Sequence, residues 1–319
     1  MTLQQLRALC MIVDQGMHVS SAATTLHRSQ PALTRQLQAL ERDLGADIFQ
    51  RKRNRIVELT PVGRDILAVA RRVVGEADTL RSVAADANAA DRGELTLATT
   101  HTQARYTLPP VIRTYMQRHP LVSLALRQGT PARCAEMVAR GIADFAICTE
   151  LSSPPADVAQ VPCYLVHRSI VTRPRHPLLR ERPLTLDAVA RYPIITYEAG
   201  FNARSVIDEA FVEAGLAPQV VLSAIDADVS KAYVELGLGI AILASIAFDR
   251  KRDAALRRID ASHLFRPSAL CVVLRKGSYL RRYMSDFIQA FAPTLTAAEI
   301  ECALAGKQMT RSARQLTAL

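Results

Sequence analysis

Residues 20–60, SSAATTLHRSQPALTRQLQALERDLGADIFQRKRNRIVELT, decide the fold of the N-terminal part of the chain. Residues 20–26 are predicted to form a short helix that packs through small apolar side chains, and residues 27–28 form a tight turn. Ser29 is a favourable N-cap for a second helix, and Gly45 ends that helix. Two short helices joined by a tight turn indicate a helix-turn-helix.

The second helix of this motif has one apolar face and one polar face. The apolar stripe recurs at spacings of four, three and four residues and consists of Leu33, Leu37, Leu40 and Leu44. Amide, hydroxyl and guanidinium groups on the other face suit base edges and phosphates in a major groove. The candidate DNA contacts of this segment are Ser29, Gln30, Pro31, Thr34, Arg35 and Gln38. A solvated helix face in a protein that never touches DNA is the alternative.

Two flanking segments favour DNA binding over that alternative. Residues 4–14 are predicted to form an amphipathic helix that completes a three-helix core. Residues 51–55, RKRNR, place cations directly after an apolar pair, as expected for a β-wing laid along a phosphate backbone. The candidate wing contacts are Arg51, Arg53 and Arg55. The sequence therefore predicts a winged helix-turn-helix over residues 1–60 that binds double-stranded DNA.

Residues 1–90 resemble the N-terminal domain of LysR-type transcriptional regulators through LQQLRAL, SSAATTLHRSQPALTRQLQALERDLGADIFQR and LTPVGR, in that order. From Gly93 onward the chain resembles the CysB type of that family, the activators of the cysteine regulon and of sulfur assimilation. The matching strings are LATTHTQARYTLPPVI, QGTPARCAEMVARGIADFAICTE, IDADVSKAYVELGLGIAILAS and YMSDFIQAFAPTLT. The resemblance fails only over the C-terminal tail, from Thr296, which is predicted to be a helix with a basic end.

The resemblance implies a transcriptional activator of sulfur assimilation, cysteine biosynthesis or sulfonate utilisation genes. It also implies homodimers that pair into a homotetramer, and a contact with RNA polymerase at the promoter. A LysR-type regulator of another metabolic pathway, with a different small-molecule effector, is the alternative.

A linker helix is predicted over residues 61–88, because Thr60 is a good N-cap and Pro61 fits the first turn. Its apolar residues repeat every three or four positions, the pattern of a short coiled-coil seam. The seam consists of Ile66, Ala70, Val73, Ala77, Leu80 and Ala84. We interpret this segment as a dimerisation helix; a long helix packed on its own domain is the alternative. Residues 89–92 are predicted to form a hinge.

After the hinge, short apolar segments alternate with helical ones, which indicates an α/β domain with largely parallel sheets over residues 93–319. The predicted strands are residues 95–98, 122–126, 145–148, 169–172, 194–196, 220–223, 240–243 and 270–274. The resemblance implies two Rossmann-like subdomains arranged as in periplasmic binding proteins, with an effector cleft between them. Subdomain I is then expected at residues 93–162 and 268–295, and subdomain II at residues 163–267.

Residues 99–103, TTHTQ, place hydroxyl, amide and backbone N–H groups at a helix N-terminus, which can hold an anion without a cation. Thr149 and Glu150 follow another strand, and strand ends of this kind line the crevice in open α/β sheets. The resemblance matches four residues to positions that hold sulfate or the acetylserine inducer, and a fifth to a further hydroxyl position. These candidate effector contacts are Thr100, Thr102, Gln103, Thr149 and Asn202. Ordinary helix caps and strand ends are the alternative.

Three residues depart from the CysB type and leave the effector open. Asn202 replaces a hydroxyl residue, Val166 stands where an aromatic side chain is expected, and Glu198 brings a carboxylate near the site. The candidate effectors are O- or N-acetylserine, sulfate, thiosulfate, an organosulfonate or a related small anion.

Composition agrees with a DNA-binding regulator. The 319 residues suffice for two or three domains, and the net charge of +10 favours polyanions. No apolar run of about 18 residues and no signal peptide are present, so we expect a cytoplasmic protein without a membrane contact. The six cysteines form no CxxC pair and are expected to be reduced and buried; a redox switch or zinc site is the alternative.

The sequence gives no catalytic residue, metal ligand or cofactor motif. The seven histidines show no HxxxH or HExxH spacing, and neither GxSxG nor a Walker loop occurs. His101 is the only candidate base near the predicted site, and a role in orienting the ligand is favoured. An exported solute-binding protein would share the cleft architecture but would have no use for residues 1–60.

Overall fold

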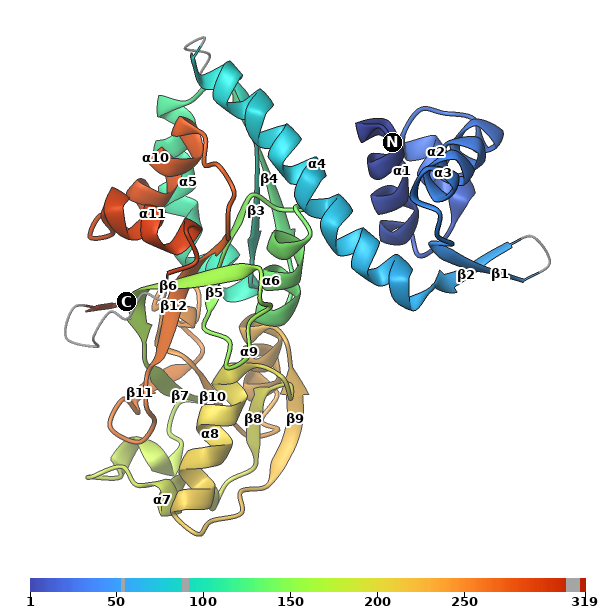
Figure 1. Cartoon of the computed structure of the whole chain (residues 1–319). Helices are drawn as coiled ribbons and strands as arrows, with labels where there is room; N and C mark the ends of the chain where they lie inside the picture. The colour runs from blue at the N-terminus through green and yellow to red at the C-terminus, as the bar shows by residue number, and fades with distance from the viewer. Residues whose placement is uncertain (53–54, 88–91, 308–315) are drawn as a thin grey trace. The chain divides into compact units, whose positions relative to one another are not determined.

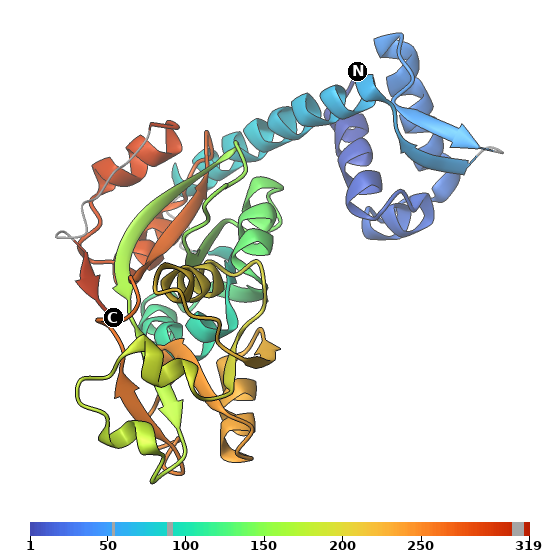
Figure 2. The same cartoon turned by 90° about the horizontal axis from the view of Figure 1, so that it is seen from below.

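The computed structural model describes residues 1–52, 55–87, 92–307 and 316–319, and it divides into two compact units, Met1–Ala89 and Ala90–Leu319. In the N-terminal unit, helices α1 (Leu3–Asp14), α2 (Val19–Thr25) and α3 (Gln30–Leu44) form a three-helix core (Figure 1). The antiparallel strands β1 (Phe49–Lys52) and β2 (Arg55–Leu59) extend from this core as a hairpin, which Figure 2 shows from below.

The sequence signals for α3 act as expected. The hydroxyl of Ser29 accepts a hydrogen bond from the backbone N–H of Ala32, and Gly45 ends the helix at a φ of 64°. The turn before it places His27 at a φ of 51°, a left-handed conformation that a tight turn between two helices requires. Leu33, Leu37 and Leu40 are buried in the core of the unit, while Leu44 is exposed.

Helix α4 (Pro61–Ala87) follows the hairpin. Its first half packs on α1, because Leu67 and Ala70 are buried in the three-helix core and Ile66 lies against it. Further along, Val73 is 42% exposed and Leu80 is 73% exposed. The start of α4, including the predicted seam residues Ile66 and Ala70, therefore packs on its own domain, whereas Val73 and Leu80 are exposed. The dimerisation helix stays a prediction. The predicted hinge falls mainly on residues outside the described ranges.

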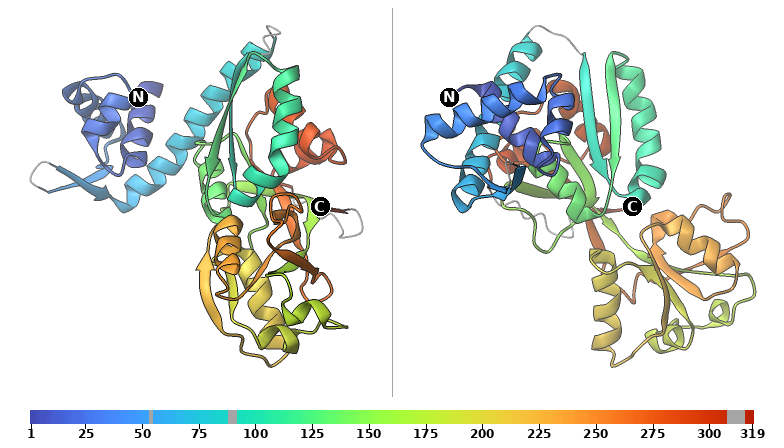
Figure 3. Two further views of the ribbon diagram at one scale, coloured as in Figure 1. Left: turned by 180° about the vertical axis from the view of Figure 1, so that it is seen from behind. Right: turned by 90° about the vertical axis from the view of Figure 1, so that its right-hand side faces the viewer.

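The C-terminal unit contains two sheets, which Figure 3 shows as separate lobes. The larger sheet, here subdomain I, has the strand order β13-β6-β12-β5-β3-β4. Its strands are β3 (Gly93–Thr99), β4 (Val122–Gln128), β5 (Phe145–Thr149), β6 (Val158–Val166), β12 (Ser268–Arg275) and β13 (Thr317–Ala318). The helices of this subdomain are α5 (Leu108–Arg118), α6 (Pro131–Ala139), α10 (Arg282–Phe291) and α11 (Ala297–Leu304), together with the π-helical turn η1 (Gln103–Thr107).

The smaller sheet, here subdomain II, has the strand order β11-β7-β10-β8-β9. Its strands are β7 (Arg168–Thr172), β8 (Ile194–Tyr197), β9 (Val220–Ala224), β10 (Ile240–Ala244) and β11 (Arg257–Asp260). Its helices are α7 (Leu186–Ala190), α8 (Asn202–Glu213) and α9 (Ala227–Glu235), with the short 3-10 turns η2 (Pro177–Arg180) and η3 (Ser245–Ala247).

The chain crosses between the subdomains twice. Strand β6 stays in the larger sheet up to Val166, and β7 begins in the smaller sheet at Arg168, so the first crossing lies at His167. This is a few residues later than the expected boundary at 163. The return lies directly before Ser268, where β12 begins.

Both sheets are mixed, which corrects the prediction of largely parallel sheets. In the larger sheet β12 is antiparallel to both β5 and β6, and in the smaller sheet β7 is antiparallel to both β10 and β11. Strands β7 and β12 each follow a crossing and enter their sheet from the other subdomain. They are therefore antiparallel to the neighbouring strands of the βαβ units. The alternation of strands and helices in the sequence did not reveal this.

The C-terminal tail adds to the larger sheet. Helix α11 confirms the helix predicted after Thr296, whose hydroxyl and the Glu299 side chain form a capping box. Residues 308–315, which include the basic end of the predicted helix, lie outside the described residues. Strand β13 then pairs in parallel with β6. Along the described stretches of the chain, we find no helix that combines the length and apolar character needed to cross a membrane.

Candidate DNA interface and candidate effector site

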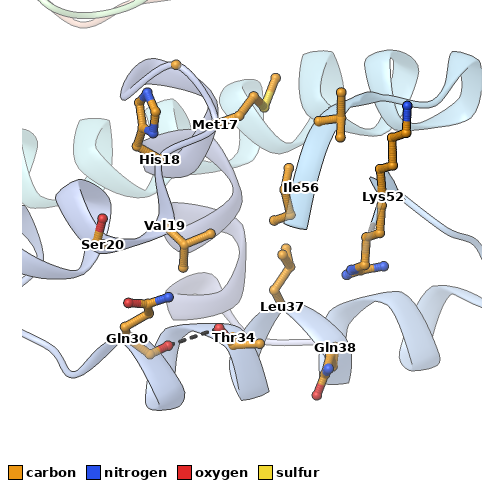
Figure 4. Close-up of a pocket in the computed structure, with 13 residues that line it drawn as sticks. Met17, His18, Val19, Ser20, Gln30, Thr34, Leu37, Gln38, Lys52 and Ile56 are labelled. Atoms are coloured by element: carbon orange, nitrogen blue, oxygen red, sulfur yellow. Dashed lines mark hydrogen bonds between the residues drawn. The ribbon is translucent and has the colours of Figure 1, made fainter. Parts of the chain in front are cut away.

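A groove of about 1290 Å³ lies between α3, the hairpin and the turn before α2. Gln30, Thr34 and Gln38 from α3 line one side, and Lys52 and Ile56 from the hairpin line the other (Figure 4). The three α3 residues recur at a spacing of four, so α3 presents them along one face. The structure thus brings together the polar helix face and the wing that the sequence predicted as parts of one surface.

The remaining predicted contacts of α3 lie at its exposed start. Ser29, Pro31 and Arg35 are exposed to solvent. Two of the hydroxyls also serve the helix itself: Ser29 caps it, and the Thr34 hydroxyl donates to the carbonyl of Gln30 at 3.0 Å. The guanidinium of Arg35 forms no salt bridge or hydrogen bond with another described residue.

Arg51 has a structural partner that the sequence did not reveal. Its Nη2 lies 2.5 Å from Oε2 of Glu41, a buried carboxylate of α3. The other oxygen, Oε1, accepts the backbone N–H groups of Ile48 and Phe49 at 2.9 and 3.3 Å. Glu41 therefore fastens the start of the hairpin to α3, and Arg51 contributes to that attachment. Arg53, and the side chain of Arg55, fall outside the described residues.

In the C-terminal unit, the predicted effector residues lie where parallel strands of the larger sheet end. Strands β3 and β5 are adjacent and parallel, with Thr99 opposite Ile147, so residues 100–103 and Thr149 follow at the same edge of the sheet. Thr100 and Gln103 are buried, and Thr102 and Thr149 are half-buried. Four of the five predicted contacts are therefore grouped at this edge.

The segment after β3 forms an unusual helical turn. The backbone N–H of Leu108 donates to the carbonyl of Gln103, five residues earlier, which makes η1 a π-turn at the start of α5. Two prolines, Pro109 and Pro110, lack the N–H groups that regular α-helical hydrogen bonds to residues 105 and 106 would need. Within η1, the Thr107 hydroxyl donates to Oε1 of Gln103 at 2.7 Å. This bond fixes the orientation of the buried Gln103 amide.

The fifth predicted contact, Asn202, reaches this edge from subdomain II. It is the first residue of α8, and its Nδ2 donates to Oε1 of Glu150 at 2.8 Å. Oε2 of Glu150 accepts the backbone N–H of Ala269 at 2.6 Å. Burial raises the pKa of the Glu150 carboxyl, and the hydrogen bonds from Ala269 and Asn202 oppose this rise. The Asn202 amide thus bridges the subdomains next to Thr149.

A second contact between the subdomains lies on α9. Tyr106 of η1 donates its hydroxyl to Asp228, and Arg105 pairs with the same carboxylate. The ammonium of Lys231 lies 2.7 Å from the Tyr106 hydroxyl and 2.9 Å from both carboxylate oxygens of Asp253. We call Arg105, Tyr106, Asp228 and Lys231 the α9 bridge. The two bridge residues of η1, Arg105 and Tyr106, therefore closely follow Thr102 and Gln103 in the chain.

The sequence did not predict the α9 bridge. It had placed His101 near the site, and His101 lies 3.9 Å from Asp226, the N-cap of α9. The sequence indicated only a short polar segment, Asp-Ala-Asp, at the start of an amphipathic helix. No local pattern shows that this segment contacts residues more than a hundred positions earlier.

A buried cation lies at the crossing between the sheets. Arg168 is 1% exposed, and it donates through Nη1 to the carbonyl of Val166 and through Nη2 to the Ser268 hydroxyl. Its Nε has no hydrogen-bond partner among the described residues. Burial lowers the pKa of Arg168, while Tyr197 and Glu150 favour its charged form. Arg168 thus ties the two crossing strands together and provides positive potential near Glu150.

The two other departures noted in the sequence lie in different subdomains. Val166 is buried in the core of subdomain I, and Glu198 is exposed directly after β8. Val166 thus provides a small apolar side chain at the crossing, and Glu198 provides a solvated carboxylate beside the loop that leads to α8.

Comparison with known proteins matches both units of the chain to one family. Residues 3–64 match the family of bacterial regulatory helix-turn-helix proteins, lysR family, and residues 88–296 match the LysR substrate binding domain. The chain is 46% identical over 300 residues to the HTH-type transcriptional regulator SsuR of Burkholderia cenocepacia, covering 94% of this chain and 97% of that protein. It is 44% identical over 307 residues to the regulator CysB of the same organism, covering 96% and 98%.

Among solved structures, the cofactor-binding domain of the Cbl transcriptional regulator matches with a TM-score of 0.64 and 39% identity. The match covers 67% of this chain and 94% of that chain. The N-terminal helix-turn-helix and the two-lobed C-terminal unit therefore both match these relatives, and the matches extend along almost the whole sequence. The chain belongs to the LysR family of bacterial regulatory helix-turn-helix proteins and, within it, to the CysB type.

Proposed function

We propose that this protein is a cytoplasmic transcriptional regulator that binds promoter DNA as a dimer and activates sulfur assimilation, cysteine biosynthesis or sulfonate utilisation genes. The observation that carries the DNA-binding part is the groove between α3 and the hairpin, lined by Gln30, Thr34 and Gln38. Amide and hydroxyl groups spaced along a helix face are suited to base edges, and the cations of the wing are suited to phosphates. Arg35, next to Thr34 on α3 but outside the lining of the groove, adds an exposed guanidinium.

The dimer follows from α4. Along the side of α4 that faces away from the three-helix core, the exposed apolar residues fall at spacings of three, four and seven, as in a coiled-coil seam. They are Val62, Val69, Val73, Leu80 and Val83. A second copy of α4 would cover this row, and the resulting two-fold protein would read paired half-sites about one helical turn, or a multiple of it, apart. Pairing of dimers into a tetramer and a contact with RNA polymerase follow from the resemblance to the family.

The effector binds, in this proposal, between the two subdomains. Thr100, Thr102, Gln103 and Thr149 supply hydroxyl and amide groups at one sheet edge, and Asn202 supplies an amide from the other subdomain. An anion at the start of the helix that follows β3 also gains from the unpaired backbone N–H groups there. Contacts from both subdomains converge on this edge. A ligand bound there therefore alters the stability of the contact between the subdomains. Acetylserine, sulfate and related small anions are the candidate effectors.

Selection from fragmented genomic DNA tests this function and requires no defined operator sequence. Purified protein is mixed with the fragments, bound fragments are recovered and sequenced, and the selection is repeated with Arg35→Ala. We expect enrichment of promoters of sulfur assimilation or sulfonate genes, lost in the variant. Enrichment of promoters from an unrelated pathway would favour the alternative, a LysR-type regulator with another effector. No enrichment would contradict sequence-specific DNA binding.

A further inference from the structure

Two ion pairs join helices α1 and α4 within the N-terminal unit. Arg7 of α1 pairs with Asp78 of α4, and Oδ1 of Asp14 in α1 lies 2.7 Å from Nη2 of Arg71 in α4. The side chains of Asp14 and Arg71 are only 25% and 31% exposed, so water screens this pair in part. Residue numbers rise along α1 as they fall along α4 from one pair to the next. The two helices are therefore antiparallel.

The order of the four charges specifies one alignment of the helices. Arg7 and Asp14 are seven residues apart on α1, and Arg71 and Asp78 are seven residues apart on α4, about two helical turns in each case. A shift of α1 by two turns along α4 would bring Arg7 to Arg71 in one direction and Asp14 to Asp78 in the other. Both alternatives place like charges together, so the charges favour the observed alignment alone.

The ion pairs extend the attachment of α4 beyond its apolar contacts. Leu67 and Ala70 are buried in the three-helix core, and the half-buried Val74 packs against it. Asp78 lies one turn after Val74 and continues the contact with α1 through its pair with Arg7. Nη1 of Arg81, on the same helix, donates to Asp78 at 3.0 Å and helps to orient its carboxylate.

The exposed apolar row of α4 lies on the other side of this helix. At about 100° per residue, Arg71, Val74 and Asp78 project from the side that faces α1. Val73 and Leu80 of the exposed row project from the roughly opposite side. The helix-turn-helix is thus held on the side of α4 that faces away from the proposed dimer seam. In a dimer through that seam, the angle between α1 and α4 determines the distance between the two copies of α3.

We propose that the pairs Arg7–Asp78 and Asp14–Arg71, here called the α1–α4 clamp, are positioning residues that fix the spacing of the two half-sites that the dimer recognises. A tilt of α4 by about 20° at its buried start would displace residues about 15 Å further along it by about 5 Å, which exceeds the ~3.4 Å rise of one base pair. Without the clamp, the dimer would accept half-sites at several spacings. This inference rests on the proposed dimer through α4 and adds what determines the length of its operator.

Selection from random-sequence DNA with the full chain measures the spacing without a known operator. Bound sequences are recovered and sequenced, and the distances between paired half-sites are counted. We expect one spacing to dominate for wild type. In Arg71→Asp or Asp14→Arg, which place like charges together, we expect neighbouring spacings to rise about threefold to tenfold relative to that spacing, the range that two partly exposed ion pairs can supply.

The double variant Asp14→Arg with Arg71→Asp exchanges the charges and should restore the wild-type spacing. Affinity for a single half-site, measured by mobility shift, should stay within about twofold of wild type in every variant, because the clamp touches no DNA in this proposal. Arg72→Asp is the matched control: Arg72 is the next residue of α4, is exposed and forms no ion pair with another described residue. Thermal unfolding checks that each variant is folded, and the neutral Asp78→Asn provides a second test if a charge reversal is unstable.

Two results would overturn the inference alone: an equally sharp spacing in wild type and in the folded single variants, or a broadened spacing that the charge exchange does not restore. Both would leave the proposed dimeric regulator standing. Recovery of unpaired half-sites by wild type would contradict the proposed dimer and this inference with it, and recovery of no common sequence would contradict specific DNA binding.

Discussion

The ammonium of Lys231 in α9 lies 2.7 Å from the hydroxyl of Tyr106 in η1, a pair separated by 125 positions in the sequence. Lys231 is 4% exposed, and it also donates to Asp253 and to the carbonyl of Ala247. Burial alone lowers the pKa of Lys231, but its hydrogen bonds with Tyr106, Asp228 and Asp253 outweigh burial and raise the pKa above its usual value. A fully charged lysine therefore anchors subdomain II to the segment that carries the candidate effector residues.

Removal of the Tyr106 hydroxyl should weaken effector binding. Tyr106→Phe keeps the ring but removes the hydrogen bonds to Asp228 and Lys231, so we expect a loss of about 1–2 kcal/mol in unfolding free energy and a several-fold rise in the effector concentration for half-maximal response. Tyr164→Phe is the control, because the Tyr164 hydroxyl donates to the carbonyl of Phe291 within subdomain I. Equal effector responses in the two variants would show that the α9 bridge serves stability alone.

Substitutions in α3 should separate the loss of a DNA contact from the loss of the fold. Arg35→Ala should lose on the order of 1–3 kcal/mol of operator binding if the guanidinium contacts a base, with the fold intact. Arg42→Ala, near the C-terminal end of the same helix, should bind nearly as wild type does, because the N-terminal residues of such a helix contact the base edges. Leu37→Asp should unfold the domain, because it buries a carboxylate where Leu37 is 1% exposed. Unchanged operator binding by Arg35→Ala in a mobility-shift assay would remove Arg35 from the interface.

The exposed row on α4 predicts the dimer interface. Val73→Glu combined with Leu80→Glu should place like charges in the seam and yield monomers in analytical ultracentrifugation. Binding to an operator with two half-sites should weaken far more than binding to a single half-site, since the second contact is no longer intramolecular. Arg72→Glu, also exposed on α4, should remain dimeric. An unaltered dimer in the double variant would place the interface elsewhere.

The cysteines should react slowly with thiol reagents in the native protein. Burial raises the pKa of Cys134 to about 12 and the pKa values of Cys148 and Cys271 well above the usual range, so little reactive thiolate forms at neutral pH. We expect the half-buried Cys302 to be labelled first, and these three only after unfolding. Rapid labelling of Cys148 or Cys271 in folded protein, detected by mass spectrometry, would reopen the alternative of a redox switch.

Local patterns in the sequence predicted the elements that local forces determine. The leucine stripe and the Ser29 and Gly45 caps predicted α3, and short apolar segments predicted eight of the strands in the two sheets, but not β6, β11 or β13. Strand β11 was missed because its sequence, RRID, is polar, as suits an edge strand. The π-turn η1 was missed because one shifted hydrogen bond at the start of a helix has no periodic signal in the sequence.

The chemistry of the site was less accessible than its location. Strand ends and the resemblance to the family indicated Thr100, Gln103 and Thr149, which the structure groups at one edge. The contacts of Glu150 with Asn202, and of Tyr106 with Lys231, join residues 52 and 125 positions apart. Such pairs have no periodicity in the sequence, because only the packing of the two subdomains brings them together. Arg51 shows the same limit at short range, since its cationic character did not reveal its bond to Glu41.

The effector response of Thr100→Val, in calorimetry and in operator binding, tests the proposed effector site most directly. Valine matches threonine in volume but lacks the hydroxyl, so an anion held by neutral donors should lose roughly 1.5–3 kcal/mol of affinity, or about ten- to a hundredfold. We predict an operator response that is lost at normal effector concentration and recovered at high concentration. Equal effector affinity in wild type and Thr100→Val would contradict the assignment of this site.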